Sequence, residues 1–172
     1  EKGIATHAPE WMKHIAIKRP DFASYLYYMM ERLHACHKVL KKTGSIYLHC
    51  DWRASHYLKM VMDEIFGHEN FRNEIIWDYG ARASQYNQYF QRKHDHILFY
   101  AKNSKLAKFK PIEIAYSEAS LAERATRYRY KDEHGLYRMT TRRAPDGSKY
   151  RAKVYLKSGV WATDVWRIPR IN

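Results

Sequence analysis

One apolar segment, residues 44–51, constrains the fold more than any other part of the sequence. Its β-branched and aromatic residues follow a glycine and precede a carboxylate, which is typical of a buried strand. A long helical pattern ends where this segment begins, and a second helical pattern runs from Ala54 to Gly67. Helix, strand and helix in this order indicate an α/β protein with a layered sheet. Because functional groups collect beyond strand ends in such sheets, residues 49–53, His-Cys-Asp-Trp-Arg, are the first candidate for the edge of a site.

The two helical patterns each carry an apolar stripe. We expect Asp21 to cap the first helix and Gly44 to end it, and Ser55 to cap the second helix, which ends at Gly67. The charged residues of the second helix, Lys59, Asp63 and Glu64, are expected to face away from the core. A short helix is also expected near residues 10–17. The stripe of the first long helix contains Phe22, Leu26, Met29, Leu33, Cys36 and Leu40.

Two further strands are expected at residues 71–79 and 96–102, with no helical pattern between them. Strands connected in this way are normally antiparallel neighbours. We therefore predict a hairpin whose polar loop, residues 80–93, is rich in glutamine and tyrosine. Loops of this length often carry function.

The positive charge of the chain points to a polyanionic partner. The formal net charge is +13 over 172 residues, and 15% of the residues are aromatic. Cations that neutralise phosphates and rings that stack on bases are typical of nucleic-acid-binding proteins, although a merely basic soluble protein would share this composition. The balance is +9 in residues 103–172 and +4 in residues 1–102. This difference favours a basic docking region at 103–172 after a first domain at 1–102.

A second hairpin is predicted within the basic region. Residues 136–143 and 150–157 alternate in polarity around a turn signal at 144–147. We expect an apolar face with Tyr137, Met139, Thr141, Tyr150, Ala152, Val154 and Leu156, and a basic face with Arg138, Thr140, Arg142, Arg151, Lys153 and Lys157. A basic face can follow a DNA backbone, although routine solvated strand residues would give the same pattern. The predicted DNA-binding residues are Arg124, Arg127, Arg129, Lys131, Arg138, Arg142, Arg151 and Lys153.

The two cysteines argue against a disulfide framework, because Cys36 lies in a helical pattern and Cys50 in a strand. They favour a reducing compartment, and we expect a cytoplasmic protein. We find no leading apolar segment of the signal-peptide type and no apolar run near the ~20 residues of a membrane span. No membrane partner is expected.

Two short groups of potential metal ligands are His94-Asp95-His96 and the helical set His34, Cys36 and His37. Either could suggest a metal-dependent nuclease. The first group alternates across a strand and the second scatters around a helix, so neither converges on one ion. We predict no metal site.

Several motifs resemble one known family. They are TGSIYLHCD at 43–51, SHYLK at 55–59, MDEIFG at 62–67, NFRNEIIW at 70–77 and HDHILFY at 94–100. In this order they closely resemble the permuted, β-class amino-methyltransferases of DNA, especially modification subunits of type III restriction systems and site-specific adenine methylases. The resemblance covers about residues 20–102, and IPRIN at 168–172 resembles the segment after the family's target-recognition region.

The resemblance implies a fold and a reaction. The fold would be a partial Rossmann-like methyltransferase sheet with flanking helices and an antiparallel hairpin, plus a small β-rich target-recognition region. The reaction would transfer a methyl group from S-adenosylmethionine to the exocyclic amine of a flipped base, with adenine N6 favoured over cytosine N4. Double-stranded DNA would be the partner, joined by a second copy of the chain or a restriction subunit.

Two family motifs are missing from this sequence. The catalytic tetrapeptide of the Asp-Pro-Pro-Tyr type is absent, as is the glycine motif for the cofactor, because the chain contains neither Pro-Pro nor Gly-x-Gly. We therefore interpret the chain as a middle fragment of a larger methylase, with no catalytic residue of its own and no activity alone. The alternative is a non-catalytic, sequence-specific DNA-binding module.

The resemblance also implies a base pocket. Its predicted residues are Phe99, His94, His49, Asp51, Trp77 and Tyr79. Phe99 would pack against the flipped base, with His94 as the second choice, and His49 and Asp51 would border the base or the cofactor. In the competing interpretation His49 is a buried strand residue, Asp51 caps the next helix and Phe99 belongs to the core.

Overall fold

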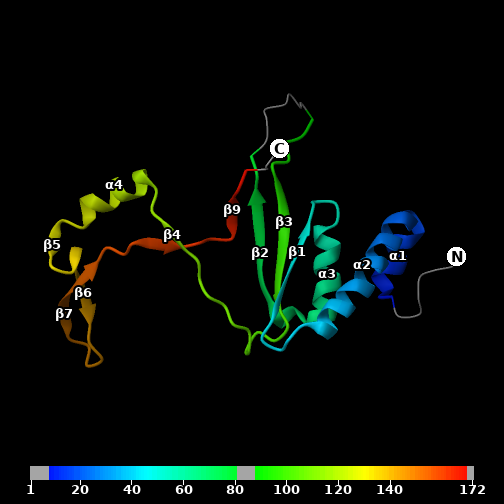
Figure 1. Cartoon of the computed structure of the whole chain (residues 1–172), viewed down its shortest axis with the longest axis horizontal. Helices are drawn as coiled ribbons and strands as arrows, with labels where there is room; N and C mark the ends of the chain where they lie inside the picture. Colours follow the sequence, from blue (N-terminus) through cyan, green and yellow to red (C-terminus); the bar gives the residue numbers. More distant parts are fainter. Residues whose placement is uncertain (1–7, 81–87, 170–172) are drawn as a thin grey trace. The chain divides into compact units, whose positions relative to one another are not determined.

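The computed structural model describes residues 8–80 and 88–169 and divides the chain into two compact units (Figure 1). The first unit runs to Phe109 and includes the segment from Thr163 onward, and the second is 110–162. These boundaries differ from the predicted break after residue 102. Residues 103–109 and 163–169 lie with the first unit because Lys108 N donates to Thr43 O and because the last strand joins the first sheet.

Four strands form the sheet of the first unit. They are β1 (Ser45–Cys50), β2 (Phe71–Asp78), β3 (His94–Ala101) and β9 (Val165–Arg167), in the order β1-β3-β2-β9. Strand β3 runs antiparallel to β1 and β2, whereas β9 is parallel to β2. The predicted α/β class and the β2–β3 hairpin are confirmed. Residues 81–87 of its loop lie outside the described residues.

Strand β1 occupies an edge of this sheet among the described residues. Only Cys50 of its six residues is buried, so the prediction of a buried strand is wrong. The apolar sequence of β1 reflects one covered face rather than two, and a strand with a single neighbour leaves more of its surface open.

Three helices cover one face of the sheet: α1 (Glu10–Lys18), α2 (Pro20–Val39) and α3 (Ser55–Phe66). Helix α3 lies beside β1 and β3, with α2 and α1 farther out (Figure 1). A short 3-10 helix, η1 (His68–Asn70), connects α3 to β2. The core between helices and sheet includes Met12, Leu26, Met30, Leu33, Leu58, Val61, Met62, Phe66, Leu98 and Tyr100. No helix among residues 8–80 and 88–169 is long and apolar enough to cross a membrane.

The helix ends differ from several expectations. Helix α2 begins before Asp21, which therefore lies in the first turn and not at the cap. It ends well before Gly44, whose φ is not positive, and Cys36 of its predicted stripe is exposed. Ser55 is the first residue of α3 and not its cap, and its buried hydroxyl has no hydrogen-bond partner among the described residues. Gly67 ends α3 with a φ of 82°, as predicted.

The prediction that Lys59 and Asp63 face away from the core is wrong. The hydroxyl of buried Tyr100 donates a 2.6 Å hydrogen bond to Asp63 Oδ1, and Lys59 Nζ lies 2.7 Å from the same carboxylate. Burial, followed by the bond to Asp63, raises the pKa of the Tyr100 hydroxyl. Helical periodicity does not predict the inward position of Lys59 and Asp63. The buried hydroxyl of Tyr100 requires a polar partner, and Asp63 supplies it on the apolar side of α3.

The second unit consists of short elements around a three-stranded sheet. Helix α4 (Glu118–Arg127) is capped by Ser117, whose Oγ accepts a 3.2 Å bond from Ser120 N. The strands are β4 (Glu113–Ala115), β5 (Tyr130–Asp132), β6 (Gly135–Arg143), β7 (Lys149–Tyr155) and β8 (Gly159–Trp161), with sheets β4-β8 and β5-β6-β7. Gly159 is the only buried residue in 110–162, so this unit has almost no apolar core.

Strands β6 and β7 form the predicted hairpin, but their register contradicts the predicted faces. Opposed residues share a face in an antiparallel pair, and the observed pairs include Arg138 with Val154, Met139 with Lys153, Thr141 with Arg151 and Arg142 with Tyr150. Each face therefore mixes basic and apolar side chains, and the predicted separation is wrong. The turn accounts for the difference, because the hydrogen bond from Ala144 N to Ser148 O sets the register of the two strands. The predicted faces require a register that differs by one residue, and such a shift moves all side chains of one strand to the other face.

Candidate functional site

An open cavity of about 670 Å³ lies at the carboxyl end of β1. Its lining comes from α2 and the turn before it, the end of β1, the following loop and the start of β3. It consists of Arg19, Asp21, Phe22, Tyr25, His49, Asp51, Arg53, Ala54 and Asp95. Sequence reasoning placed His49, Asp51 and Arg53 at this edge, but not Asp95 or the residues of α2. Those come from distant parts of the chain, and only the pairing of β1 with β3 reveals Asp95.

His49 is joined to Asp95 across the β1–β3 ladder. Its Nε2 lies 3.1 Å from Asp95 Oδ2. The His49 side chain is 54% exposed while Asp95 is buried, so His49 is not the buried strand residue of the competing interpretation. A buried carboxylate that orients an exposed imidazole leaves the other ring nitrogen available for a ligand in the cavity.

Asp51 is held by the residue two positions later. Its carboxylate accepts hydrogen bonds from Arg53 Nε at 2.8 Å and from the Arg53 backbone N–H at 2.9 Å. The bond from the guanidinium is the largest cause of a lowered pKa at Asp51. Asp51 is therefore ionised at neutral pH, and its carboxylate binds the turn before α3 rather than capping the helix.

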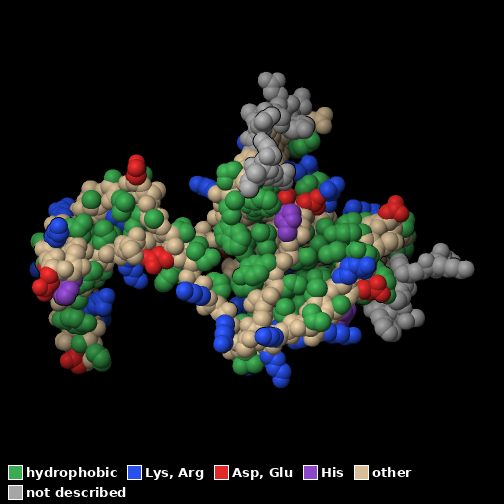
Figure 2. Space-filling view, viewed as in Figure 1, with side chains coloured by type: hydrophobic (Ala, Val, Ile, Leu, Met, Phe, Trp, Pro, Cys, Tyr) green, Lys and Arg blue, Asp and Glu red, His purple; other side chains and the backbone are tan. Residues whose placement is uncertain are grey.

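Trp77 lies beside His49, and Tyr79 lies beside Trp77. The rings of His49 and Trp77 are 5.5 Å apart, and Tyr79 follows at 5.6 Å from Trp77. Trp77 Nε1 donates a 2.8 Å bond to Ile168 O, which fixes the indole against the segment after β9. Hydrophobic side chains gather over β2 and β3 on the face seen in Figure 2. Half-buried aromatic rings therefore border the His49–Asp95 pair.

The structure separates the two predicted base-contacting residues. Phe99 lies on the same sheet face as His49, but only 5% of it is exposed because Tyr47 stacks on its ring and Phe109 lies 6.0 Å away. His94 lies on the opposite face, where its ring is 5.2 Å from that of His96. The cluster that forms around His49 therefore includes Asp95, Trp77 and Tyr79, with Phe99 beneath Tyr47 and His94 apart.

Cys50 ends β1 on the helix-facing side of the sheet. Burial, followed by the carboxylates of Asp51, Glu74 and Asp95, raises the pKa of its thiol to about 12. A thiol that stays protonated is neither a nucleophile nor a metal ligand. Among residues 8–80 and 88–169, no group of three or more His, Cys, Asp or Glu side chains is placed to hold a metal ion.

The predicted DNA-binding residues of the second unit have different local settings. Arg127 pairs with Glu123 at 3.0 Å, and Lys153 pairs with Asp132 at 2.6 Å. The bond from Lys153 is the largest cause of a lowered pKa at Asp132. The guanidinium of Arg124 lies over a tyrosine ring, as does that of Arg138. The exposed residues of the set are Arg127, Arg129, Lys131, Arg138, Arg142, Arg151 and Lys153.

Comparison with known proteins gives a consistent result. The model of a DNA methylase family, N6_N4_Mtase, matches residues 6–172. The chain is 27% identical over 154 residues to the Mod subunit of the type III restriction-modification enzyme StyLTI of Salmonella typhimurium strain LT2, covering 87% of this chain and 23% of the relative. It is 30% identical over 123 residues to the type II methyltransferase M.EcaI of Enterobacter cloacae, covering 72% and 26%. The chain thus spans about a quarter of the length of these relatives.

Proposed function

Because the chain belongs to the DNA methylase family, we propose that it is the part of a site-specific DNA methyltransferase that binds DNA and forms one wall of the target-base pocket. The complete protein would transfer a methyl group from S-adenosylmethionine to the exocyclic amine of a flipped base, adenine N6 in preference to cytosine N4. The first unit would be part of a Rossmann-like catalytic domain, and the second unit would be the target-recognition region.

The observation that carries this proposal is the His49 cluster. An extrahelical base has lost its stacking partners, and the aromatic faces of Trp77 and Tyr79 can replace them. The imidazole of His49, oriented by Asp95, can form a hydrogen bond to a base edge. Phe99 belongs to the same wall, but a base reaches its ring only after Tyr47 has turned away.

Gly44 and Gly67, the glycines beside β1 and α3, do not form a cradle for S-adenosylmethionine. Glycine-rich loops hold such cofactors because the backbone can approach closely where no side chain intervenes. Here the space beside Gly44 is filled by Leu40, whose Cγ lies 3.1 Å from the position of a Cβ, and the space beside Gly67 is filled by Glu69. The proposed cofactor site therefore requires residues other than these, and the 172 residues alone should leave methylation of DNA by labelled cofactor at background.

The charge of the second unit supports the proposed DNA binding. Residues 110–162 hold 12 Lys and Arg against 6 Asp and Glu, a balance of +6, and most of the predicted DNA-binding side chains are exposed. Double-stranded DNA is the proposed partner, because cations that neutralise its phosphates release counterions. A second copy of this chain and a restriction subunit are proposed as further partners, since some relatives are Mod subunits of restriction-modification enzymes.

Duplex binding at several salt concentrations tests the DNA-binding part of the proposal. We expect the affinity, measured by fluorescence anisotropy, to fall at least about tenfold between about 50 and 200 mM salt. Replacing Arg138, Arg142, Arg151 and Lys153 by Ala should weaken binding strongly. The matched control removes four exposed lysines of the first unit, Lys18, Lys38, Lys41 and Lys42, and should weaken it much less. A salt-independent affinity, or equal losses in the two variants, would contradict the proposal.

The base-pocket part is tested in the complete methyltransferase. His49→Ala should lower methylation while leaving duplex affinity unchanged, because the imidazole contacts the base only after flipping. The alternative, a DNA-binding module with no part in methyl transfer, predicts normal methylation by His49→Ala. His68→Ala, which alters an exposed histidine outside the cavity, provides the control.

A further inference from the structure

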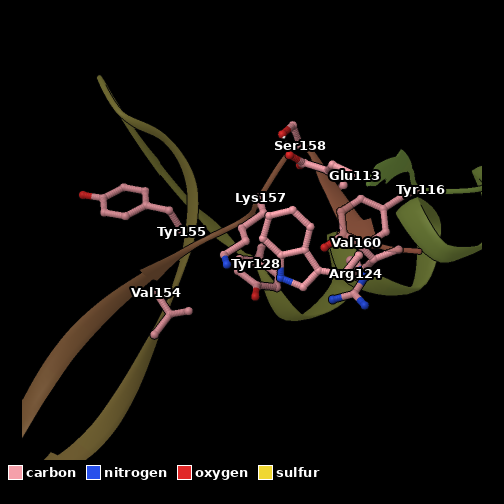
Figure 3. A pocket seen from close by; sticks show the side chains of 11 residues that line it. Glu113, Tyr116, Arg124, Tyr128, Val154, Tyr155, Lys157, Ser158 and Val160 are labelled. Carbon is pink, nitrogen blue, oxygen red and sulfur yellow. Dashed lines mark hydrogen bonds between the residues drawn. The ribbon is translucent and has the colours of Figure 1, made fainter. Parts of the chain in front are cut away.

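The second unit contains an open cavity of its own, with a volume of about 700 Å³ (Figure 3). It is formed by α4, the paired strands β4 and β8 and the end of β7. The residues that concern its chemistry are Glu113, Tyr116, Arg124, Tyr128, Lys157 and Trp161. Its volume falls within the range of about 300–1,000 Å³ that is usual for small-ligand sites.

Aromatic and cationic side chains both line this cavity. The guanidinium of Arg124 lies 4.3 Å from the ring centroid of Tyr116, and this contact holds the planar cation against the wall. Figure 3 shows Arg124 close to Tyr116, whereas Tyr155 points away from the others. Trp161 is 58% exposed, so its ring remains open to a ligand.

The polar balance of the cavity favours an anion attached to a flat ring. Glu113 is the acidic residue in the lining, and its Oε1 already accepts a 2.7 Å bond from Ser158 Oγ. The lining therefore contains two cations, Arg124 and Lys157, and one carboxylate that already accepts a hydrogen bond. Exposed aromatic faces attract planar rings, while a guanidinium and an ammonium attract phosphate.

The wall of the cavity depends on a close approach of two strands at Gly159. A Cβ at this position would lie 2.3 Å from Ile114 O, so only glycine lets β8 pair with β4 at this distance. Trp161 lies two residues further along β8, opposite Glu113. The geometry that presents the indole to the cavity is thus fixed by backbone pairing rather than by an apolar core.

We propose that this cavity binds a single unstacked nucleotide of DNA. Its base would stack on Trp161 or Tyr128, and its phosphate would pair with Arg124 and Lys157. A concave site excludes stacked base pairs, whereas one extrahelical nucleotide matches both its rings and its cations. The inference rests on the proposed DNA binding of the second unit. It concerns a nucleotide other than the methyl-accepting base, which the His49 cluster would receive.

A bulged DNA tests the inference in the 172-residue chain. The two probes are a perfect duplex and the same duplex with one extra unpaired thymidine, compared by anisotropy at one salt concentration. We expect the bulged probe to bind about tenfold more tightly, because stacking of a single base on an aromatic ring is favourable. Trp161→Ala should abolish this preference, and Trp161→Phe should keep most of it.

A charge-matched pair separates the cavity from general electrostatics. Arg124→Ala and Arg127→Ala each remove one cation from α4, but only Arg124 lines the cavity. Arg127→Ala should weaken both probes equally, whereas Arg124→Ala should also reduce the preference for the bulge. Equal binding of the two probes by the unaltered chain, or a preference that survives Trp161→Ala and Arg124→Ala, overturns this inference and leaves the proposed DNA binding intact. Failure to bind either probe overturns both.

Discussion

The ring of Phe99 lies 4.3 Å from the ring of Tyr47, and the two planes are only 7° from parallel. Phe99 is 5% exposed and Tyr47 51% exposed, so Tyr47 covers Phe99 on the open face of the sheet. Phe99 therefore has a packing role as well as its proposed place in the base-pocket wall. Any functional test of Phe99 has to separate these two contributions.

The first prediction concerns the stability of variants at this stack. Phe99→Ala should lower the free energy of unfolding by about 3 kcal/mol, a loss similar to that for Leu98→Ala on the helix-covered face. Tyr47→Ala should lower it much less, because Tyr47 is half exposed. Urea unfolding followed by circular dichroism measures all three. A Phe99→Ala variant as stable as the unaltered chain would show that Phe99 contributes little to packing.

The two cysteines should differ sharply in reactivity. Cys36 is exposed, whereas Cys50 is buried and has a thiol pKa of about 12. Because the thiolate is the reactive form, only Cys36 should react with a disulfide reagent at about pH 8, and Cys50 should react only after unfolding. The reagent releases one thiolate for each cysteine it modifies, so the amount released before and after addition of denaturant gives the number of reactive cysteines in each state. Cys36→Ser is the control, and rapid modification of that folded variant would contradict the burial of Cys50.

Lys102 should stabilise the C-terminal end of α2. Its Nζ donates to His37 O and, at 2.9 Å, to Leu40 O, so one ammonium satisfies carbonyls that the helix leaves open. Lys102→Met keeps the aliphatic stem and should cost about 1.5–3 kcal/mol, the usual worth of hydrogen bonds to a charged group. Lys105→Met, at an exposed position, should change the melting temperature little. Equal melting temperatures for both variants would argue against this role.

Local periodicity predicted the elements of the first unit well, and their surroundings poorly. The apolar stripes of α2 and α3 and the β2–β3 hairpin depend on residues close in sequence, and all three are observed, except that Cys36 of the α2 stripe is exposed and Leu40 follows the end of the helix. Whether β1 is covered on one face or two depends on which elements pack on each face of the sheet, and whether it is an edge strand depends on its neighbours. Its own residues encode neither. The capping predictions at Asp21 and Ser55 failed because each helix begins at or before the proposed cap residue.

The candidate site shows the same division. His49 was proposed because it lies at the end of a recognisable strand, and Trp77 and Tyr79 because they lie at the end of the strand before the hairpin loop; their place in a base pocket stays a prediction. Asp95 and Tyr47 entered the site only through the register of β1 against β3, which joins residues far apart in sequence. The cavity of the second unit was not predicted at all, since β4 and β8 are too short to give a periodic signal.

The observed register of the β6–β7 hairpin gives the last prediction. Thr141 lies opposite Arg151, although the sequence assigned them to different faces. Opposed Cβ atoms in an antiparallel pair are about 4.5–5.5 Å apart, close enough for a disulfide with small adjustment. In a Cys36→Ser background, Thr141→Cys with Arg151→Cys should therefore cross-link on mild oxidation, as seen by mass spectrometry. Thr141→Cys with Tyr150→Cys, the pair that the sequence placed on one face, should not. The reverse pattern would mean that the strands pair one residue out of the observed register, which would restore a basic face to the hairpin.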